Sequence, residues 1–175
     1  MVRNKISPAI ASSLFTLTIL STIIGIFITI YFFFISPDLA YRIAAVILVG
    51  IVGILSFLRH SVFYLSDQAR MGWTQDRPEF QLEVGYANLA IGLVALSASL
   101  LNWGSLACGI SLITYGTYLL CALLLHAYEA VCIIEIRARA IRSLFSTAFF
   151  VVTLYILGFL ALAQSHASPF SILKP

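Results

Sequence analysis

The chain has 175 residues, of which 61% are hydrophobic and 10% are charged, and its net charge at pH 7 is +3. About a quarter of the residues of a soluble domain are charged, so this composition excludes a soluble globular protein and predicts an all-α integral membrane helical bundle. The longest non-apolar segment, residues 59–83, is too short for a soluble catalytic domain. The small net charge indicates membrane topology and no nucleic-acid partner.

The first apolar run covers residues 9–35, between Pro8 and Pro37. At about 1.5 Å per residue, this run is long enough to cross a hydrocarbon core of about 30 Å. A cleaved secretory signal peptide is the alternative, because basic residues precede the run. The apolar part of a signal peptide has only about 7–15 residues, however, so we expect a retained first span.

The second predicted span covers residues 43–65 and contains two ionisable residues near its end. Its uncharged part, residues 43–58, is short for a crossing, and apolar residues resume at 62–65, beyond Arg59 and His60. We therefore expect the helix to continue through these two residues, with the Arg59 side chain extending towards the interface.

Three more spans are expected, at residues 80–101, 105–128 and 143–163, which makes five in a single transmembrane domain. A tight uncharged turn at Asn102-Trp103-Gly104 separates the third span from the fourth. The charged segment 129–142 is predicted to extend the fourth helix out of the membrane.

The distribution of basic residues predicts the orientation of these spans. With a cytoplasmic N-terminus, eight basic residues lie on the cytoplasmic side and two on the other side. The eight are Arg3, Lys5, Arg59, Arg70, Arg77, Arg137, Arg139 and Arg142, and the two are Arg42 and Lys174. Cytoplasmic loops carry an excess of Lys and Arg, so we expect the N-terminus inside and the C-terminus outside, in the cell membrane or an inner membrane.

Small residues line one face of the third predicted span. Gly85, Gly92, Ala95 and Ser99 follow helical spacing, so they face the same side. Small side chains allow another helix backbone to approach closely. We expect this helix-packing seam to be used either inside the bundle or between two copies in a homo-oligomer.

The fourth predicted span carries a polar stripe that either packs against neighbouring helices or lines a cavity. Its members are Ser111, Tyr115, Tyr118, Ala122, His126 and Glu129.

Six polar residues share the predicted cytoplasmic side, because the second and fourth spans end there and the third begins there. They are Arg59, His60, Glu83, Asn88, His126 and Glu129. Ionisable residues in or near a span are costly and usually face the protein interior. We therefore treat this polar cluster as the candidate functional site.

Three interpretations of the cluster remain open. In the structural one, Arg59 pairs with Glu83 and each histidine donates to a carbonyl or a carboxylate. In the second, the cluster is a substrate or proton site. In the third, His60 and His126 are ligands of a metal or haem, with Glu129 or Glu83 in support. Two histidines on separate helices do not form a ligand motif, so the structural interpretation is favoured.

The three cysteines do not indicate a disulfide or a catalytic site. Cys108, Cys121 and Cys132 are separated by 13 and 11 residues, roughly 20 and 16 Å along one helix, which is too far for a bond. The sequence contains no nucleophile elbow, phosphate loop or zinc-protease motif, and we assign no catalytic residue.

The segment around the third span has the most distinctive pattern, Gly72-Trp73 followed by Phe80-Gln81-x-Glu83-x-Gly85-x-x-Asn88-Leu89-Ala90-x-Gly92. It resembles an uncharacterised family, a domain of unknown function, of small multi-span membrane proteins. In that family a histidine near the end of a following span corresponds to His126. The resemblance covers residues 59–130 and implies an integral membrane protein with no established activity. The family's Gly- and Asn-rich ending is missing here.

The same segment also has a physical interpretation that does not depend on the resemblance. Gln81 and Glu83 are expected to accept hydrogen bonds from the first-turn amides of the third span, where the helix dipole favours a carboxylate.

From these observations we expect a small non-enzymatic membrane protein without a cofactor, surrounded by the lipid bilayer. It would act as a scaffold, as an accessory subunit of a larger membrane complex, or as a transporter of a small solute. The alternative is a redox protein or a metal- or haem-binding protein that uses His60 and His126.

Overall fold

The computed structural model describes residues 7–72, 78–132 and 137–167, with the side chains of the last segment placed from Leu144 to His166. These residues are almost entirely helical, and five helices are long and apolar enough to cross a membrane. They are Ala9–Phe33, Pro37–Val62, Glu79–Leu100, Gly104–Cys132 and Leu144–His166. The predicted five-span helical bundle is therefore confirmed.

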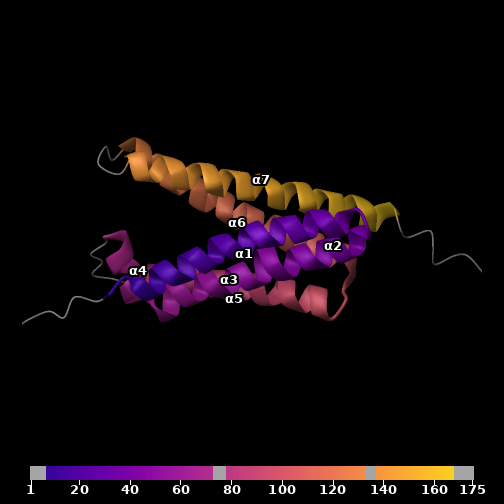
Figure 1. The fold of residues 1–175 in the computed structure, drawn as a ribbon, viewed down its shortest axis with the longest axis horizontal. Helices are drawn as coiled ribbons and strands as arrows, with labels where there is room; N and C mark the ends of the chain where they lie inside the picture. The colour runs from indigo at the N-terminus through magenta and orange to yellow at the C-terminus, as the bar shows by residue number, and fades with distance from the viewer. Residues whose placement is uncertain (1–6, 73–77, 133–136, 168–175) are drawn as a thin grey trace, which may run out of the picture.

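The first span is helix α1, Ala9–Phe33, and the second is a continuous run of four segments. These are α2 (Pro37–Ala44), η1 (Ala45–Ile51), α3 (Val52–Phe57) and η2 (Leu58–Val62). Then follow α4 (Tyr64–Met71), α5 (Glu79–Leu100), α6 (Gly104–Cys132) and α7 (Arg137–Ala167). Helix α4 lies at one end of the bundle, and the α1–α2 and α5–α6 turns lie at the other (Figure 1). We call these the α4 end and the Asn102 end.

The helix of the second span begins at Pro37, before residue 43, where the span itself is predicted to start, because the sequence there favours a helix start. The Ser36 hydroxyl accepts from the backbone amide of Leu39 at 3.5 Å, and Pro37 occupies the first helical position. Asp38 lies in the first turn, where the helix dipole favours a negative charge. This Ser-Pro-Asp start precedes the apolar run from which the span was predicted.

The helix of the second span ends at Val62, before residue 65, where the span is predicted to end. It passes through its two ionisable residues in a π-helical turn, in which the amide of Phe63 donates to Leu58 O, five residues back, at 2.8 Å. Phe63 then leaves the helical conformation, with φ −109° and ψ 32°. Tyr64 starts α4 as a separate short helix, which turns back towards the beginning of α1.

Glycines bring the second span and α5 into backbone contact. A Cβ atom added to Gly53 would lie 2.7 Å from Asn88 O, and one added to Gly92 would lie 3.2 Å from Gly50 O. Such approach is open only to residues without a side chain. The structure therefore places the predicted small-residue seam against another helix of the same chain, and the seam residues Ala95 and Ser99 are also buried.

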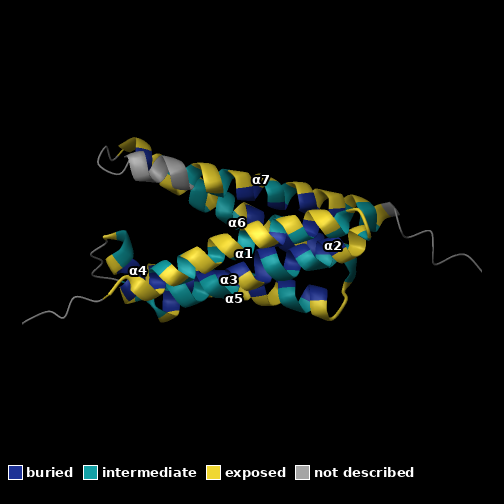
Figure 2. Cartoon of the chain, viewed as in Figure 1, coloured by how far each residue is buried: buried dark blue, intermediate teal, exposed yellow. Residues whose placement is uncertain are grey.

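Helices α6 and α7 form a hairpin in which the two backbones approach closely, as those of the second span and α5 do. A Cβ atom on Gly109 of α6 would lie 3.0 Å from Gly158 O of α7. The hairpin joins the other helices through a buried apolar cluster that includes Leu48, Leu112 and Leu154. Towards the α4 end the hairpin diverges from α1, α3 and α5 (Figure 1). The outer faces of the bundle are mostly exposed (Figure 2), as expected for surfaces that face lipid.

Candidate functional site

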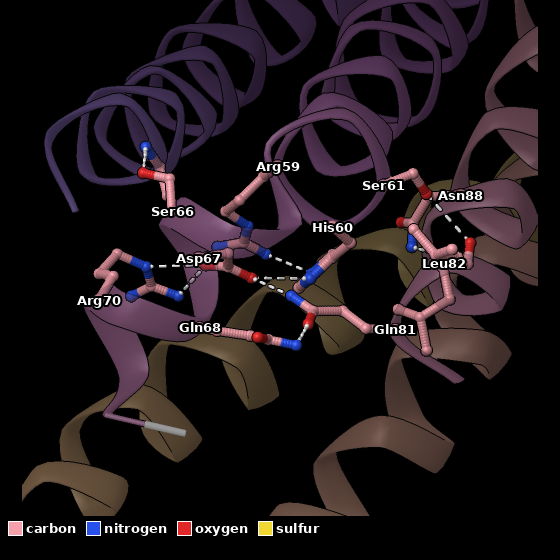
Figure 3. A network of polar contacts seen from close by, with 12 residues as sticks. Arg59, His60, Ser61, Ser66, Asp67, Gln68, Arg70, Gln81, Leu82 and Asn88 are labelled. Carbon is pink, nitrogen blue, oxygen red and sulfur yellow. Dashed lines mark hydrogen bonds and ion pairs between the residues drawn. The ribbon is translucent and has the colours of Figure 1, made fainter. Parts of the chain in front are cut away.

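A buried carboxylate is the centre of the polar network at the α4 end (Figure 3). Asp67 of α4 is fully buried, and both of its carboxylate oxygens bind donors. The Oδ1 atom accepts from Nε and Nη2 of Arg70, each at 2.9 Å. The Oδ2 atom lies 3.0 Å from Nδ1 of His60 and accepts from Nε2 of Gln81 at 3.1 Å. Asp67 thereby connects α4 to the second span and to α5.

The contacts of His60 define its tautomer. Nη2 of Arg59 lies 2.8 Å from Nε2 of His60, and a guanidinium group can only donate. Nε2 of His60 must therefore be the acceptor, so the ring proton is on Nδ1, which faces Asp67. His60 is neutral in this arrangement. Arg59, Arg70 and Asp67 together carry one net positive charge.

The first transmembrane helix contributes an aromatic ring to the same network. The guanidinium carbons of Arg59 and Arg70 lie 5.2 and 4.8 Å from the ring centroid of Phe15 in α1. Both distances are within the range of a cation–π interaction. Nε of Arg59 is buried without a hydrogen-bond partner in the described structure. The ring of Phe15 therefore supplies part of the stabilisation that a carboxylate would give Arg59.

Helix α4 also contacts the start of α1 through a serine next to Asp67. Ser66 of α4 donates from its hydroxyl to Ser7 O at 2.8 Å, and its oxygen accepts from the amide of Ala11 at 3.1 Å. Ala11 is in the first turn of α1, where backbone amides have no partner within the helix. Ser66 therefore caps a helix that lies more than fifty residues earlier in the chain.

The π-helical turn η2 also brings the second span against α5. Ser61 of this turn is buried, and its hydroxyl donates to Leu82 O at 3.0 Å. It lies where a Cβ atom of Gly85 would be, so the contact requires glycine at that position. Single π-helical turns inside longer helices often occur at functional sites. Here the turn contains Arg59, His60 and Ser61, three residues that bind other elements.

The pKa of Asp67 depends on burial, which opposes ionisation, and on neighbouring donors and positive charges, which favour it. Burial alone would raise this pKa, but the N–H of His60 and the positive charges of Arg59 and Arg70 outweigh burial. They hold the pKa of Asp67 below its usual value of 3.8. Asp67 is therefore ionised at neutral pH despite its burial.

Nearer the middle of the bundle lies a second, separate polar group. The side-chain amide of Asn88 in α5 donates to Tyr118 OH at 2.9 Å, and its oxygen accepts from Tyr115 OH at 3.0 Å. The two tyrosine rings of α6 are stacked 6.1 Å apart. Among the residues of the predicted stripe, Ser111 and Tyr115 are buried, whereas His126 is exposed because α6 diverges from the bundle.

The predicted six-residue cluster divides into three parts. Arg59 and His60 belong to the Asp67 network, and Asn88 binds the two tyrosines. His126 and Glu129 pair with each other, with 3.1 Å between Nδ1 and Oε2 and side chains that are 52% and 43% exposed. Topology predicted correctly that these helix ends lie at the same end of the bundle, but it did not determine their lateral separation.

The expected pairing of Arg59 with Glu83 was wrong. Glu83 is exposed and forms no ion pair with any residue that the structure describes, and the acidic residue near Arg59 is Asp67. The role predicted for Gln81 was also wrong, because its side chain binds Asp67 and accepts from Gln68 at 3.1 Å, and caps no helix. These differences share one cause, which is that α4 turns back and inserts Asp67 between the second span and α5.

The donor set does not fit the metal or haem site of the alternative interpretation. Both ring nitrogens of His60 face side chains of the same chain, Arg59 and Asp67. His126 contacts Glu129. In residues 7–72, 78–132 and 137–167, no group of three or more His, Cys, Asp or Glu side chains is arranged to hold a metal ion.

Sequence reasoning missed Asp67 as the centre of the site, although one signal was present. Asp67 is seven residues after His60 and three before Arg70, and both spacings place side chains on one helical face. An acidic residue between basic ones, directly after a span, is therefore a candidate for pairing. Gln68 and Phe15 had no comparable signal, because their contacts depend on the packing of separate helices.

These features define the class of the protein as a small polytopic membrane protein of five helices with a buried charged network at one end. A family model matches residues 8–169, so the chain belongs to the family of unknown function DUF6790. The expected membership of an uncharacterised family is confirmed. Neither the curated proteins nor the solved structures include a match to the chain.

Proposed function

We propose that the protein is a non-enzymatic membrane scaffold or accessory subunit, and that the Asp67 network fixes the shape of its bundle. The observation that supports this proposal is that both oxygens of Asp67 accept hydrogen bonds from its own chain, Oδ1 from Arg70 and Oδ2 from Gln81, while Nδ1 of His60 lies 3.0 Å from Oδ2. A buried charge whose donors all come from its own chain stabilises a fold. A substrate site would instead leave polar groups directed into a cavity.

The positions of two surface cavities support the same proposal. Two surface cavities of about 180 and 200 Å³ are lined mainly by aliphatic side chains of the second span, α5 and α6. Neither cavity includes a residue of the Asp67 network.

The experiment that tests the proposal compares the parent chain with His60→Gln and His126→Gln. Glutamine keeps a polar amide at each site and removes the imidazole ligand. A scaffold predicts that both variants accumulate in the membrane and purify with the parent's oligomeric state. Metal analysis and an ultraviolet–visible spectrum would be recorded on the same detergent-purified samples. A stoichiometric metal or haem in the parent that is lost in both variants would overturn the proposal.

A subunit role predicts in addition that one face of the bundle contacts another protein. A photo-crosslinking residue at Phe149 of α7, which is 64% exposed, would be compared with one at Phe27 of α1, which is 70% exposed. Discrete crosslinked products at one position and not at the other would support a subunit role. Crosslinks to lipid alone at both positions would contradict it and leave the scaffold role.

The second candidate function is a pathway for a small solute, favoured by the polar group of Asn88, Tyr115 and Tyr118 inside the bundle. Single cysteines at Ser111, Tyr118 and Ala122, in a chain without its native cysteines, would be treated with a membrane-impermeant thiol reagent. Labelling at successive positions would indicate a water-filled path and replace the scaffold proposal. Protection at all three positions is the result that we expect.

A further inference from the structure

The Asn102 end contains an arginine whose charge has no ion-pair partner among the described residues. Arg42 is in α2, five residues after the start of the second span, which places its Cα about 7.5 Å along the helix. No ion pair joins it to a carboxylate in the described part of the chain. Asp38, one turn earlier, instead accepts from Nε2 of Gln164 at 3.3 Å. An arginine near the end of a span reaches the membrane interface, where a group of opposite charge can compensate it.

A reciprocal pair of hydrogen bonds fixes the direction of this arginine. Nε of Arg42 donates to Ser99 O at 3.2 Å, and the hydroxyl of Ser99 donates to Arg42 O at 3.0 Å. The two terminal amino groups of the guanidinium have no partner among the described residues. Two adjacent N–H groups of this kind match two oxygens of a phosphate.

Arg42 also lines an apolar cavity. Its volume is about 180 Å³, and its lining consists of Leu39, Ile43, Val46 and Ile47 together with Arg42 and Ser99. Leu39 precedes Arg42 by three residues, and Ile43, Val46 and Ile47 follow it along α2 and η1. The cavity therefore extends from Arg42 along the second span. The lining of this cavity therefore combines one cationic residue, Arg42, with an aliphatic surface.

We propose that this cavity binds a glycerophospholipid, with the phosphate on Arg42 and the first part of one acyl chain along Ile43, Val46 and Ile47. A soluble phosphate would leave the aliphatic surface uncovered, and a neutral lipid would leave the guanidinium unpaired. A phospholipid satisfies both requirements at the depth where arginine side chains reach the interface. The proposal is independent of the scaffold role.

Native mass spectrometry of the detergent-purified full chain tests the proposal, with phosphatidylglycerol and diacylglycerol of the same acyl chains as probes. We expect one retained phosphatidylglycerol, bound at least tenfold more tightly than diacylglycerol. Arg42→Gln should remove this preference, because a charge-assisted pair accounts for about tenfold or more in affinity. Arg42→Lys should keep part of it, since lysine retains the charge without the fork.

A second variant tests the acyl part of the site without any change of charge. Val46→Trp fills the cavity and should weaken phosphatidylglycerol binding at least tenfold. Val152→Trp, on a 55% exposed position of α7, is the matched control and should bind like the parent. Glycerol phosphate, which has no acyl chains, should not displace the lipid. Unchanged binding in both Arg42→Gln and Val46→Trp, or displacement by glycerol phosphate, would overturn the proposal.

Discussion

The hydroxyl of Ser61 occupies the position that a Cβ atom of Gly85 would take, and it donates from there to Leu82 O at 3.0 Å. This contact joins the second span to α5 at the α4 end, next to the Asp67 network. It depends on a side chain from one helix and the lack of a side chain on the other. Either residue can therefore be changed to test the contact.

Gly85→Ala should lower the free energy of unfolding by about 1–3 kcal/mol, because the added methyl group forces Ser61 and its helix outward. Equilibrium unfolding in mixed micelles measures the change. Gly116→Ala is the control, since a Cβ atom there would meet Leu154 and Tyr155 at ordinary contact distances of 3.4 Å and more. The loss should become smaller in a chain that also carries Ser61→Gly. A full loss in that double variant would show that Ser61 is not the obstacle.

Asp67→Asn should destabilise the bundle by about 3 kcal/mol. Removal of one partner from a buried ion pair typically costs about 3–5 kcal/mol, and the low end applies because Arg70 is 22% exposed. The same unfolding measurement on Glu129→Gln provides a control, because that residue pairs with His126 at an exposed site. Exposed pairs contribute about 0–1 kcal/mol. Equal effects of the two substitutions would contradict a structural role for the Asp67 network.

Comparison of the helical bundle with the Asp67 network shows what could be predicted from the sequence. The five spans, the seam of Gly85 and Gly92, and the turn at Asn102 follow from local composition and helical periodicity. Asp67 did not, because its burial depends on the break at Phe63, which turns α4 back onto the bundle. Hydropathy gives the depth of a residue in the membrane, and it gives no lateral position. His60 and His126 could therefore be assigned to one end, but their separation could not be predicted.

Acidification should weaken the bundle through Asp67. The folded-state pKa of this carboxyl is lower than its usual value of 3.8, so its contribution to stability is complete above that value. The contribution is lost as the pH falls below 3.8 and through the lower folded-state pKa. Unfolding free energies of the parent and of Asp67→Asn should therefore converge in this acid range. A difference that stays constant from pH 7 down to pH 2 would contradict this linkage.

Ser66→Ala should destabilise the start of α1 more than the rest of the bundle. The Ser66 hydroxyl satisfies Ala11 N–H, and the loss of such a cap costs about 1 kcal/mol. Hydrogen exchange should show faster exchange in the first turn of α1 and unchanged exchange in α6. Thr16→Ala is the control, because the Thr16 hydroxyl donates to Ser12 O within its own helix. Faster exchange in both variants would mean that α1 frays for another reason.

Tyr115→Phe distinguishes a structural polar group at Asn88 from a water-filled one. The hydroxyl of Tyr115, which is 1% exposed, donates to Asn88 Oδ1 at 3.0 Å. Its removal leaves a buried amide oxygen unpaired, which costs about 1–3 kcal/mol in a dry interior. Water would replace the lost donor in an open pathway, so the unfolding free energy would hardly change. Tyr155→Phe is the control, because that hydroxyl contacts Thr117 at an exposed position. A large loss confined to Tyr115→Phe would support the scaffold, whereas two small losses would favour the solute pathway.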